Sequence, residues 1–337
     1  MNNDKRRGST MVIALWALLT LVVFAVQLGS IVRQKVTLVH RLNDRDTRFL
    51  VAEAGIKQAI VQLRKEDAIF EADYLGERWS HQPDTFEKIA VGQGAFTVSY
   101  QLREGESSVV MYGMQDEESK INLNKADVEI MTRLLEIAAN LSHWDAQELA
   151  YCIIDWRDAD SFFQHPQYGA EDSDYRSQES SYEAKDFNFE VMEELLLVHK
   201  MDQEIFDKLK YFVTIYGEGK VNINTAPKEA LLALGLNSRL VEDILSFRRG
   251  ADMISATSDD EIFLQTATIV PRLSQLYDLS PSDISDLSNL VAEGKFTVKS
   301  ENFMIHSVGQ LDTKKGQTTI VAVADRTGRI KYWREEI

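Results

Sequence analysis

The sequence predicts an α+β fold in which a long N-terminal helix packs on an antiparallel sheet and a large α-helical insertion separates the strands. A helical pattern runs unbroken from Gly8 to Lys65, strand-like segments lie in 94–114 and 293–337, and the sequence between them is mainly helical with an internal repeat. Because both strand segments alternate apolar and polar residues, we expect them to form one sheet that the insertion interrupts.

The N-terminal helix is expected to have two halves of different chemistry. Residues 9–32 contain no charged side chain, and a helix of this length spans about 36 Å, enough to cross a hydrocarbon core of about 30 Å. Beyond Arg33 the pattern predicts an amphipathic helix that needs a surface to pack on. The apolar side chains that recur there at helical spacing are Val39, Leu42, Phe49, Ile56, Ile60 and Leu63.

Charge and cysteine content exclude several function classes. The net charge is −16, and residues 1–42 carry +5, which leaves −21 for the remainder. A body this acidic repels nucleic-acid phosphates and suits cations or basic partners. Cys152 is the only cysteine, so an intramolecular disulfide and a thiol cluster for zinc are both excluded. No G-x-S-x-G, H-E-x-x-H or Walker motif is present and the six histidines are scattered, so we do not expect an enzyme.

The first residues have the layout of a cleaved leader. Three basic residues precede Gly8, and the apolar stretch that follows is longer than the 7–15 residues of a secretory signal and lacks an A-x-A site at its end. The basic residues orient the anchor, with residues 33–337 on the non-cytoplasmic side. The layout resembles the class III signal of type IV pilins and pseudopilins, which implies cleavage by a prepilin peptidase between Gly8 and Ser9. An uncleaved signal anchor is the alternative. Such pilins usually carry Glu at the fifth mature position, where this chain has Ile13.

The insertion contains two copies of one pattern. Ile121-Asn-Leu-Asn-Lys-Ala is matched by Val221-Asn-Ile-Asn-Thr-Ala, and each is followed by two helical segments, 127–139 with 144–156 and 227–234 with 238–249. The pattern resembles the helix-hairpin-helix of DNA-binding proteins, but the paired hairpin glycines are missing and the flanks are acidic, which favours a packing role. Further helices are expected at 189–198, 203–212 and 259–267. Residues 250–290 are assigned no role.

An acidic loop in the first copy is the best candidate site. Between Asp155 and Asp174 six carboxylates face one arginine, Arg157. Hard oxygen ligands on a long loop suit Ca²⁺, although the spacing is not that of an EF-hand. The alternative is a solvated acidic loop.

Taken together, these motifs resemble the K-type minor pseudopilin of type II secretion systems. The resemblance rests on the glycine-cleaved apolar helix and on the segments D-W-x-D-x-D from Asp155, G-A-E-D-x-x-Y from Gly169 and N-x-N-T-A-P from Asn222. It implies a pilin-like fold at the tip of a short periplasmic pseudopilus, anchored in the bacterial inner membrane and joined to the I-type and J-type minor pseudopilins. It also implies calcium binding, with the ligand candidates Asp158, Asp160, Glu171, Asp172 and Asp174.

The predicted organisation follows from this resemblance. The divisions are a leader (1–8), a transmembrane half-helix (9–32), an amphipathic helix with the first strands (33–114), the helical insertion (115–292) and the last strands (293–337). A membrane-anchored helix-hairpin-helix DNA-binding protein of a DNA-uptake or type IV pilus system is the alternative function.

Overall fold

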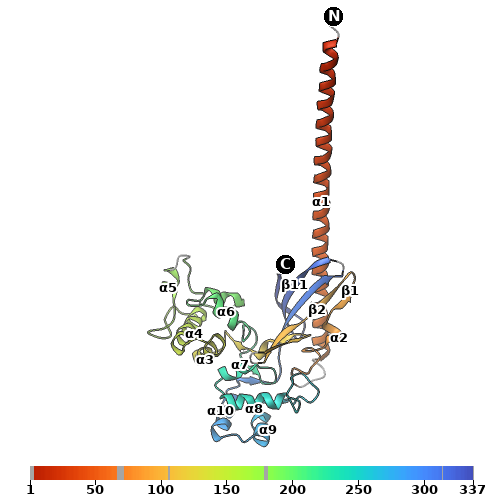
Figure 1. Cartoon of the computed structure of the whole chain (residues 1–337). Coiled ribbons are helices and arrows are strands. Elements are labelled where there is room, and N and C mark those ends of the chain that lie inside the picture. The colour runs from red at the N-terminus through yellow and green to blue at the C-terminus, as the bar shows by residue number, and fades with distance from the viewer. Residues whose placement is uncertain (1–3, 67–71, 105–106, 178–180, 313, 337) are drawn as a thin grey trace.

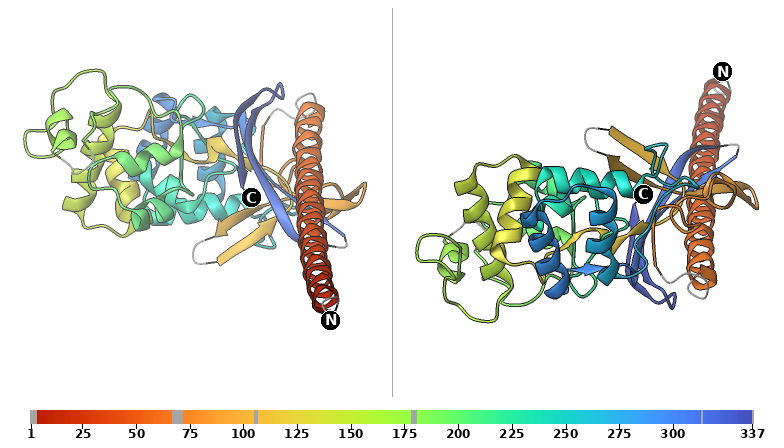
Figure 2. Two further views of the ribbon diagram at one scale, coloured as in Figure 1. Left: turned by 90° about the horizontal axis from the view of Figure 1, so that it is seen from above. Right: turned by 90° about the horizontal axis from the view of Figure 1, so that it is seen from below.

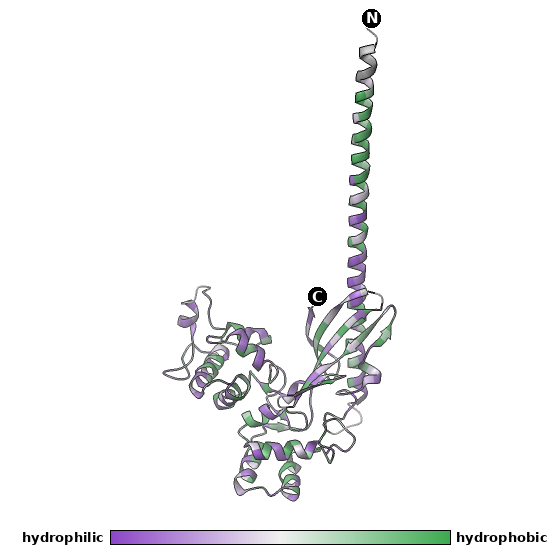
Figure 3. Ribbon diagram, in the orientation of Figure 1, coloured by the Kyte–Doolittle hydropathy of each residue, from purple (hydrophilic) through white to green (hydrophobic). Residues whose placement is uncertain are grey.

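The computed structural model describes residues 4–66, 72–104, 107–177, 181–312 and 314–336. Helix α1 (Asp4–Glu66) runs for 63 residues, about 95 Å, and its N-terminal half projects alone from the body (Figure 1). Its apolar residues concentrate in that projecting half (Figure 3). Within the described ranges, α1 is the one helix long and apolar enough to cross a membrane. The single long helix predicted from the sequence is confirmed.

The C-terminal half of α1 packs on an antiparallel sheet. The strand order is β1 (Ile89–Val91), β2 (Gly94–Val98), β10 (Asn302–Leu311), β11 (Lys314–Asp325) and β12 (Ile330–Glu336), and β5 (Gln115–Asp116) also pairs with β10. Strand β2 lies beside β10 with Val98 opposite Ser307, so strands from both sides of the insertion share one sheet. This confirms the sheet predicted from the two separate strand segments.

Contact between α1 and the sheet begins later along the helix than the apolar pattern predicts. Val39 and Leu42 are exposed, whereas Ile56 and Leu63 are fully buried against the sheet. The approach is close because Gly309 has no side chain: a Cβ there would lie 2.3 Å from the Arg48 carbonyl oxygen. Nothing in the described part of the chain covers the exposed apolar residues between the apolar N-terminal half of α1 and this contact.

One expectation about the strands is wrong. The sequence predicts that the whole of 94–114 joins the sheet with 293–337, but of its strands only β2 does so. The remaining strands, β3 (Tyr100–Glu104) and β4 (Ser107–Met111), form a separate two-stranded sheet. This hairpin instead lies toward the insertion, where the Arg103 guanidinium stacks 3.7 Å above the centre of the Tyr211 ring. A short helix, α2 (Pro83–Phe86), precedes β1 and buries Phe86.

The insertion consists of two units with the same plan. The first contains β6 (Ile121–Asn122), α3 (Val128–Ala139), α4 (His143–Arg157), α5 (Asp172–Arg176), η2 (Met192–Leu197), α6 (Gln203–Leu209) and β7 (Val213–Thr214), and follows η1 (Glu117–Ser119). The second contains β8 (Val221–Asn222), α7 (Lys228–Ala233), α8 (Ser238–Arg248), η3 (Thr266–Thr268), α9 (Ile269–Leu276), α10 (Pro281–Ala292) and β9 (Phe296–Thr297). Strand β6 pairs in parallel with β7, and β8 with β9. Each unit therefore begins and ends at its own parallel strand pair.

The helix pairs predicted from the repeat are confirmed, but two other helices differ. Residues 259–265 are not helical, and regular structure resumes at η3; the segment 189–198 becomes the 3-10 turn η2. Residues 250–290, which the sequence leaves without a role, supply the loop and most of the two helices that complete the second unit. Both units share one hydrophobic core, which runs from Ile121 to Phe296. The insertion extends to one side of the axis of α1 (Figure 2).

Candidate metal centre

A repeated asparagine makes the same pair of hydrogen bonds inside each of the two units. In the first unit the Asn124 side-chain amide donates to the Phe189 carbonyl at 3.0 Å and accepts from the Phe189 N–H at 2.7 Å. In the second unit Asn224 makes the same pair of bonds to Phe263, at 3.0 and 2.9 Å. The asparagine of each repeat therefore fastens the long loop that follows the second helix of its unit.

Each helix hairpin also ends at an arginine that donates to backbone carbonyl oxygens of the repeated motif. Arg157, at the end of α4, donates to the carbonyl oxygens of Leu123 and Ala126. Arg248, at the end of α8, donates to the Ala226 carbonyl oxygen at 2.6 Å. Since Ala126 and Ala226 occupy the same place in the repeat, Arg157 and Arg248 are structural equivalents. The residues after them, Asp158 and Arg249, are therefore also equivalent in position but opposite in charge.

Asp155 holds the acidic loop of the first unit in place by hydrogen bonds to its backbone. This side chain is fully buried, and its two oxygens accept hydrogen bonds from the backbone N–H groups of Gln164 (3.2 Å) and Ala170 (3.1 Å). Gly169, with φ of +103°, passes so close that a Cβ would lie 2.0 Å from the Asp155 carboxylate. Asp155 thus fixes the loop that carries the predicted ligands, a role that its spacing did not indicate.

Two of the predicted ligands have oxygen atoms that the protein does not satisfy. Asp158 accepts from the Gln164 side-chain amide at 2.8 Å with one oxygen, while its other oxygen is buried with no hydrogen-bond partner among the described residues. Glu171 is 3% exposed, and within the same part of the chain neither of its carboxylate oxygens has a partner. Asp160 is exposed and accepts from the Phe162 N–H at 3.0 Å.

The other two predicted ligands shape the end of the loop. Asp172 forms an ion pair with Arg176 at 2.9 Å and accepts from the Ala184 N–H at 3.1 Å. Asp174 accepts from the Glu171 N–H at 3.1 Å, at the start of α5. Their oxygens therefore already have protein partners, and their assignment as ligands stays a prediction.

Sequence reasoning missed Asp186. This residue has a φ of +51° and donates its N–H to the Trp156 carbonyl at 3.1 Å, which brings it back to the end of α4. One of its oxygens is buried and has no partner in the described chain. Because Asp186 lies beyond α5, no local spacing links it to the acidic loop.

The carboxylates of this region repel each other electrostatically. Burial raises the pKa of Glu171, and the charges of Asp155, Asp158, Asp186 and Asp160 add to this, so that the pKa is about 7. Burial also raises the pKa of Asp155 to about 6. Poorly solvated carboxylates near one another are stabilised by a cation, and their oxygen chemistry suits Ca²⁺. Within the described ranges, however, no three Asp, Glu, His or Cys side chains converge as they stand on one metal position.

The predicted processing site lies near the beginning of α1. Gly8 and Ser9 belong to its first turns, and Ile13, in place of the usual Glu, is exposed. This end of α1 stands far from the body of the protein (Figure 1).

Comparison with known proteins gives one consistent result. A family model described as type II secretion system protein K matches residues 109–218, which include the acidic loop. Type II secretion system protein K of Pseudomonas aeruginosa is 29% identical over 249 residues, 68% of this chain and 69% of that protein. In sequence, the chain is therefore similar to type II secretion system protein K.

The fold comparison covers more of the chain than the sequence comparisons do. The matched structure is a chain of the GspK–GspI–GspJ complex of the enterotoxigenic Escherichia coli type 2 secretion system, with a TM-score of 0.67 and 17% identity. The match covers 89% of this chain and 99% of the other. It confirms the predicted combination of a long helix, an antiparallel sheet and helical segments, and it includes regions outside 109–218.

Proposed function

We propose that the protein caps the tip of a type II secretion pseudopilus, where it helps to initiate pseudopilus assembly and protein export across the outer membrane. The observation that carries this proposal is the fold match to a protein that was crystallised as a complex with GspI and GspJ. The corresponding partners of this chain would be the I-type and J-type minor pseudopilins. The role is structural, and we propose no catalytic step.

Helix α1 provides the means of anchoring and assembly. Its apolar half would hold the subunit in the inner membrane, with the body in the periplasm, until prepilin peptidase cuts between Gly8 and Ser9. Exposed apolar side chains continue past the membrane half, at Val36, Val39 and Leu42, and would then pack against the helices of partner subunits.

The shape of the insertion supports a terminal position. It extends sideways from the axis of α1 and would obstruct a further subunit stacked on the same side (Figure 2). Ile13 supports the same position, because without a carboxylate the subunit lacks the link to the amino terminus of a neighbour.

Two measurements on cells that contain the native secretion system test this function. The first is N-terminal sequencing and mass analysis of the purified protein, in which a start at Ser9, with or without a methylated amino group, is expected. The second is co-purification, in which the I-type and J-type subunits should accompany the full chain in about equal amounts. An intact Met1 together with no co-purification would remove the proposal. Finding the native protein along the shaft would contradict the tip position.

We further propose that the acidic loop of the first unit binds Ca²⁺. Buried oxygens of Asp158, Glu171 and Asp186 that have no hydrogen-bond partner among the described residues support it, together with the solvent-exposed carboxylate of Asp160. A bound cation would supply the charge that offsets the repulsion among these groups. Asp172 and Asp174 remain candidate ligands from the sequence, although the protein already engages them.

The calcium proposal has a direct thermal test. The double variant Asp160→Ala with Glu171→Ala should lower the Tm in calcium but leave it unchanged, or raise it, in chelator, because it removes ligands and also removes repulsion. Glu204→Gln, an exposed carboxylate on α6 that pairs with Lys208, is the control and should not change the calcium response. An equal loss of Tm in both buffers would show a structural role without metal.

The alternative function, DNA binding by the helix hairpins, gains no specific support. Lys228, at the start of α7, forms an ion pair with Glu242 at 2.5 Å. The hairpin of the first unit turns at Asn140, which has a φ of +58°, and carries His143 in contact with Glu136. These acidic neighbours disfavour a phosphate backbone.

A further inference from the structure

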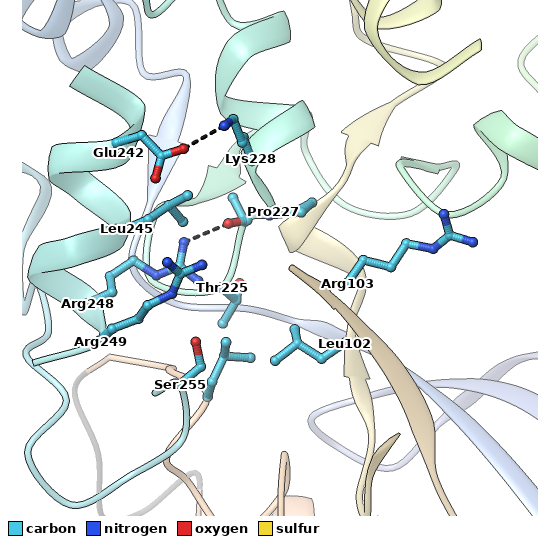
Figure 4. Close-up of a pocket in the computed structure, with 12 residues that line it drawn as sticks. Leu102, Arg103, Thr225, Pro227, Lys228, Glu242, Leu245, Arg248, Arg249 and Ser255 are labelled. Atoms are coloured by element: carbon cyan, nitrogen blue, oxygen red, sulfur yellow. Dashed lines mark hydrogen bonds and ion pairs between the residues drawn. The ribbon is translucent and has the colours of Figure 1, made fainter. Parts of the chain in front are cut away.

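A basic pocket lies where the second unit meets the β3–β4 hairpin. Its cavity is about 220 Å³, and its walls come from β3, from the start of α7, from the end of α8 and from the loop at Ser255 (Figure 4). The apolar part of the lining consists of Leu75, Leu102, Ala226, Pro227 and Leu245.

The charges around this pocket are opposite to those of the protein as a whole. The lining residues include four basic side chains and one carboxylate, Glu242, whereas the chain beyond residue 42 has a net charge of −21. Glu242 is itself paired with Lys228 at the pocket wall (Figure 4). The other three basic residues are Arg103, Arg248 and Arg249.

The internal repeat shows that the basic character is specific to the second unit. Arg157 and Arg248 hold equivalent carbonyl groups, so Asp158 and Arg249 stand at the same point of their units. In the first unit this point carries a carboxylate with an unsatisfied oxygen, near other carboxylates. In the second unit it carries a guanidinium beside a cavity. The same scaffold therefore presents opposite charges at its two equivalent positions.

We propose that this pocket binds the carboxylate of an Asp or Glu side chain from a partner polypeptide. A guanidinium has five N–H donors in a planar fork that matches a carboxylate and can serve several acceptors at once. The apolar walls formed by Leu102, Pro227 and Leu245 would cover the apolar neighbours of that side chain in the partner. The cavity has room for one or two side chains, and the acidic surroundings disfavour a polyanion such as nucleic acid. The inference does not depend on the proposed place of the subunit in a pseudopilus.

Peptide binding to the full chain in detergent micelles tests the proposal. The probe is acetyl-Leu-Glu-Leu-amide, titrated by calorimetry, and its matched control is acetyl-Leu-Gln-Leu-amide, which lacks only the charge. Since hydrogen bonds to a charged group contribute about 1.5–3 kcal/mol, we expect the Gln peptide to bind at least about tenfold more weakly. Equal binding of the two peptides would overturn the proposal.

Three variants locate the binding. Arg249→Ala should weaken binding of the Glu peptide about tenfold, and Arg249→Lys by an intermediate factor because a lysine keeps the charge but not the fork. Arg239→Ala, which removes another cation of α8 that donates to the Asp278 carbonyl at 2.9 Å, should leave the affinity unchanged. A loss as large for Arg239→Ala would mean general attraction rather than this pocket.

A competition experiment distinguishes a peptide carboxylate from a small anion. Inorganic phosphate at the concentration of the peptide should displace little of it, because phosphate gains nothing from the apolar walls. Displacement by phosphate at equal concentration would overturn the proposed polypeptide ligand. The Tm of each variant, measured without peptide, shows whether it is folded before its affinity is interpreted.

Discussion

At the scale of single residues, the insertion depends on polar side chains that bond to backbone groups far along the chain. Asn224 is 2% exposed and satisfies both the N–H and the C=O of Phe263 across 39 positions of sequence. Asn124 does the same for Phe189 across 65 positions. The first asparagine of each motif shapes the turn: the side chains of Asn122 and Asn222 accept the N–H of the residue two positions ahead. A short sequence motif thus organises the two long loops of the insertion.

Replacing one of these asparagines should destabilise the protein. Asn224→Ala leaves two buried backbone groups of Phe263 without partners, so we expect a loss of about 2–4 kcal/mol in the free energy of unfolding. Urea denaturation of the wild type and the variant measures it. Asn289→Ala removes an exposed asparagine of α10 and should change stability by less than about 0.5 kcal/mol. Similar values for both variants would contradict the assigned role of Asn224.

The buried carboxylate of Glu171 should make stability depend on pH. Its pKa in the folded protein is about 7, raised above the ordinary 4.5 by burial. The folded state therefore holds this proton more tightly than the unfolded state, so the contribution is complete below about pH 4.5 and is lost as the pH rises through 7. In chelator, the Tm should fall over this range.

Glu171→Gln provides the comparison for that pH dependence. An amide cannot ionise, so the fall in Tm between about pH 4.5 and 7 should be smaller in the variant than in the wild type. Thermal unfolding in chelator at several pH values measures both curves. The same decrease of Tm with pH in the two proteins would show that other titrating groups cause the decrease.

At the scale of elements, the contact of α1 with the sheet depends on small residues at the point of closest approach. Gly309 in β10 lies against the backbone of α1, and the neighbouring Ser307 hydroxyl donates to the Ala52 carbonyl at 2.8 Å. Gly55 faces Ser307 from the helix side, where a Cβ would lie 2.2 Å from the hydroxyl oxygen. Because helix and sheet approach this closely, their contact fixes the direction in which the apolar N-terminal half of α1 leaves the body.

A methyl group at Gly309 should disturb this contact. Gly309→Ala places a Cβ within 2.6 Å of two backbone atoms of α1, so helix and strand must separate, and we expect a loss of about 1–3 kcal/mol. Thermal unfolding of the full chain in detergent measures the change. Gly29→Ala, in the apolar half of α1 where an added Cβ would have nothing within 4 Å, is the matched control and should not lower the Tm. An undisturbed Tm for Gly309→Ala would show that the helix has room to move.

At the scale of the whole molecule, a buried polar network joins the sheet to the insertion. The Asp116 carboxylate, at the end of β5, accepts from Ser300 (2.7 Å) and from Asn222 of the second unit (3.1 Å). Asp73, from the segment after α1, accepts from the Ser300 N–H at 2.7 Å and forms an ion pair with Arg326, both side chains being almost completely buried. This network brings the segment after α1, the insertion and the last strands to one point. It fixes how the insertion stands relative to the helix.

Breaking the ion pair between Asp73 and Arg326 should lower the free energy of unfolding substantially. Asp73→Ala leaves the Arg326 charge buried without its carboxylate, and such losses cost about 3–5 kcal/mol. Urea denaturation measures the loss, and limited proteolysis should show faster cleavage between the sheet and the insertion. Glu193→Ala breaks the exposed contact of η2 with Arg334 and should cost less than about 1 kcal/mol. An equal loss of stability in the two variants would mean that the buried network does not hold the sheet and the insertion together.

The sequence by itself determined the features that depend on local pattern. The length of α1 follows from an uninterrupted helical pattern, and its apolar half from the uncharged residues 9–32. The two helix hairpins follow from the repeated N-x-N-x-A motif and its caps. That strands on both sides of the insertion share one sheet also followed, because strand patterns flank the insertion. These properties are set by neighbouring residues, so they can be read without the fold.

Only the tertiary structure decided the features that join distant positions. It turned the β3–β4 hairpin away from α1, placed 250–290 in a second complete unit and brought Asp186 to the acidic loop. It also showed that Asp155, a residue of the most acidic segment, fastens the loop through two backbone N–H groups. Which oxygens remain unsatisfied depends on hydrogen bonds formed across the fold, and no spacing in the sequence encodes those partners.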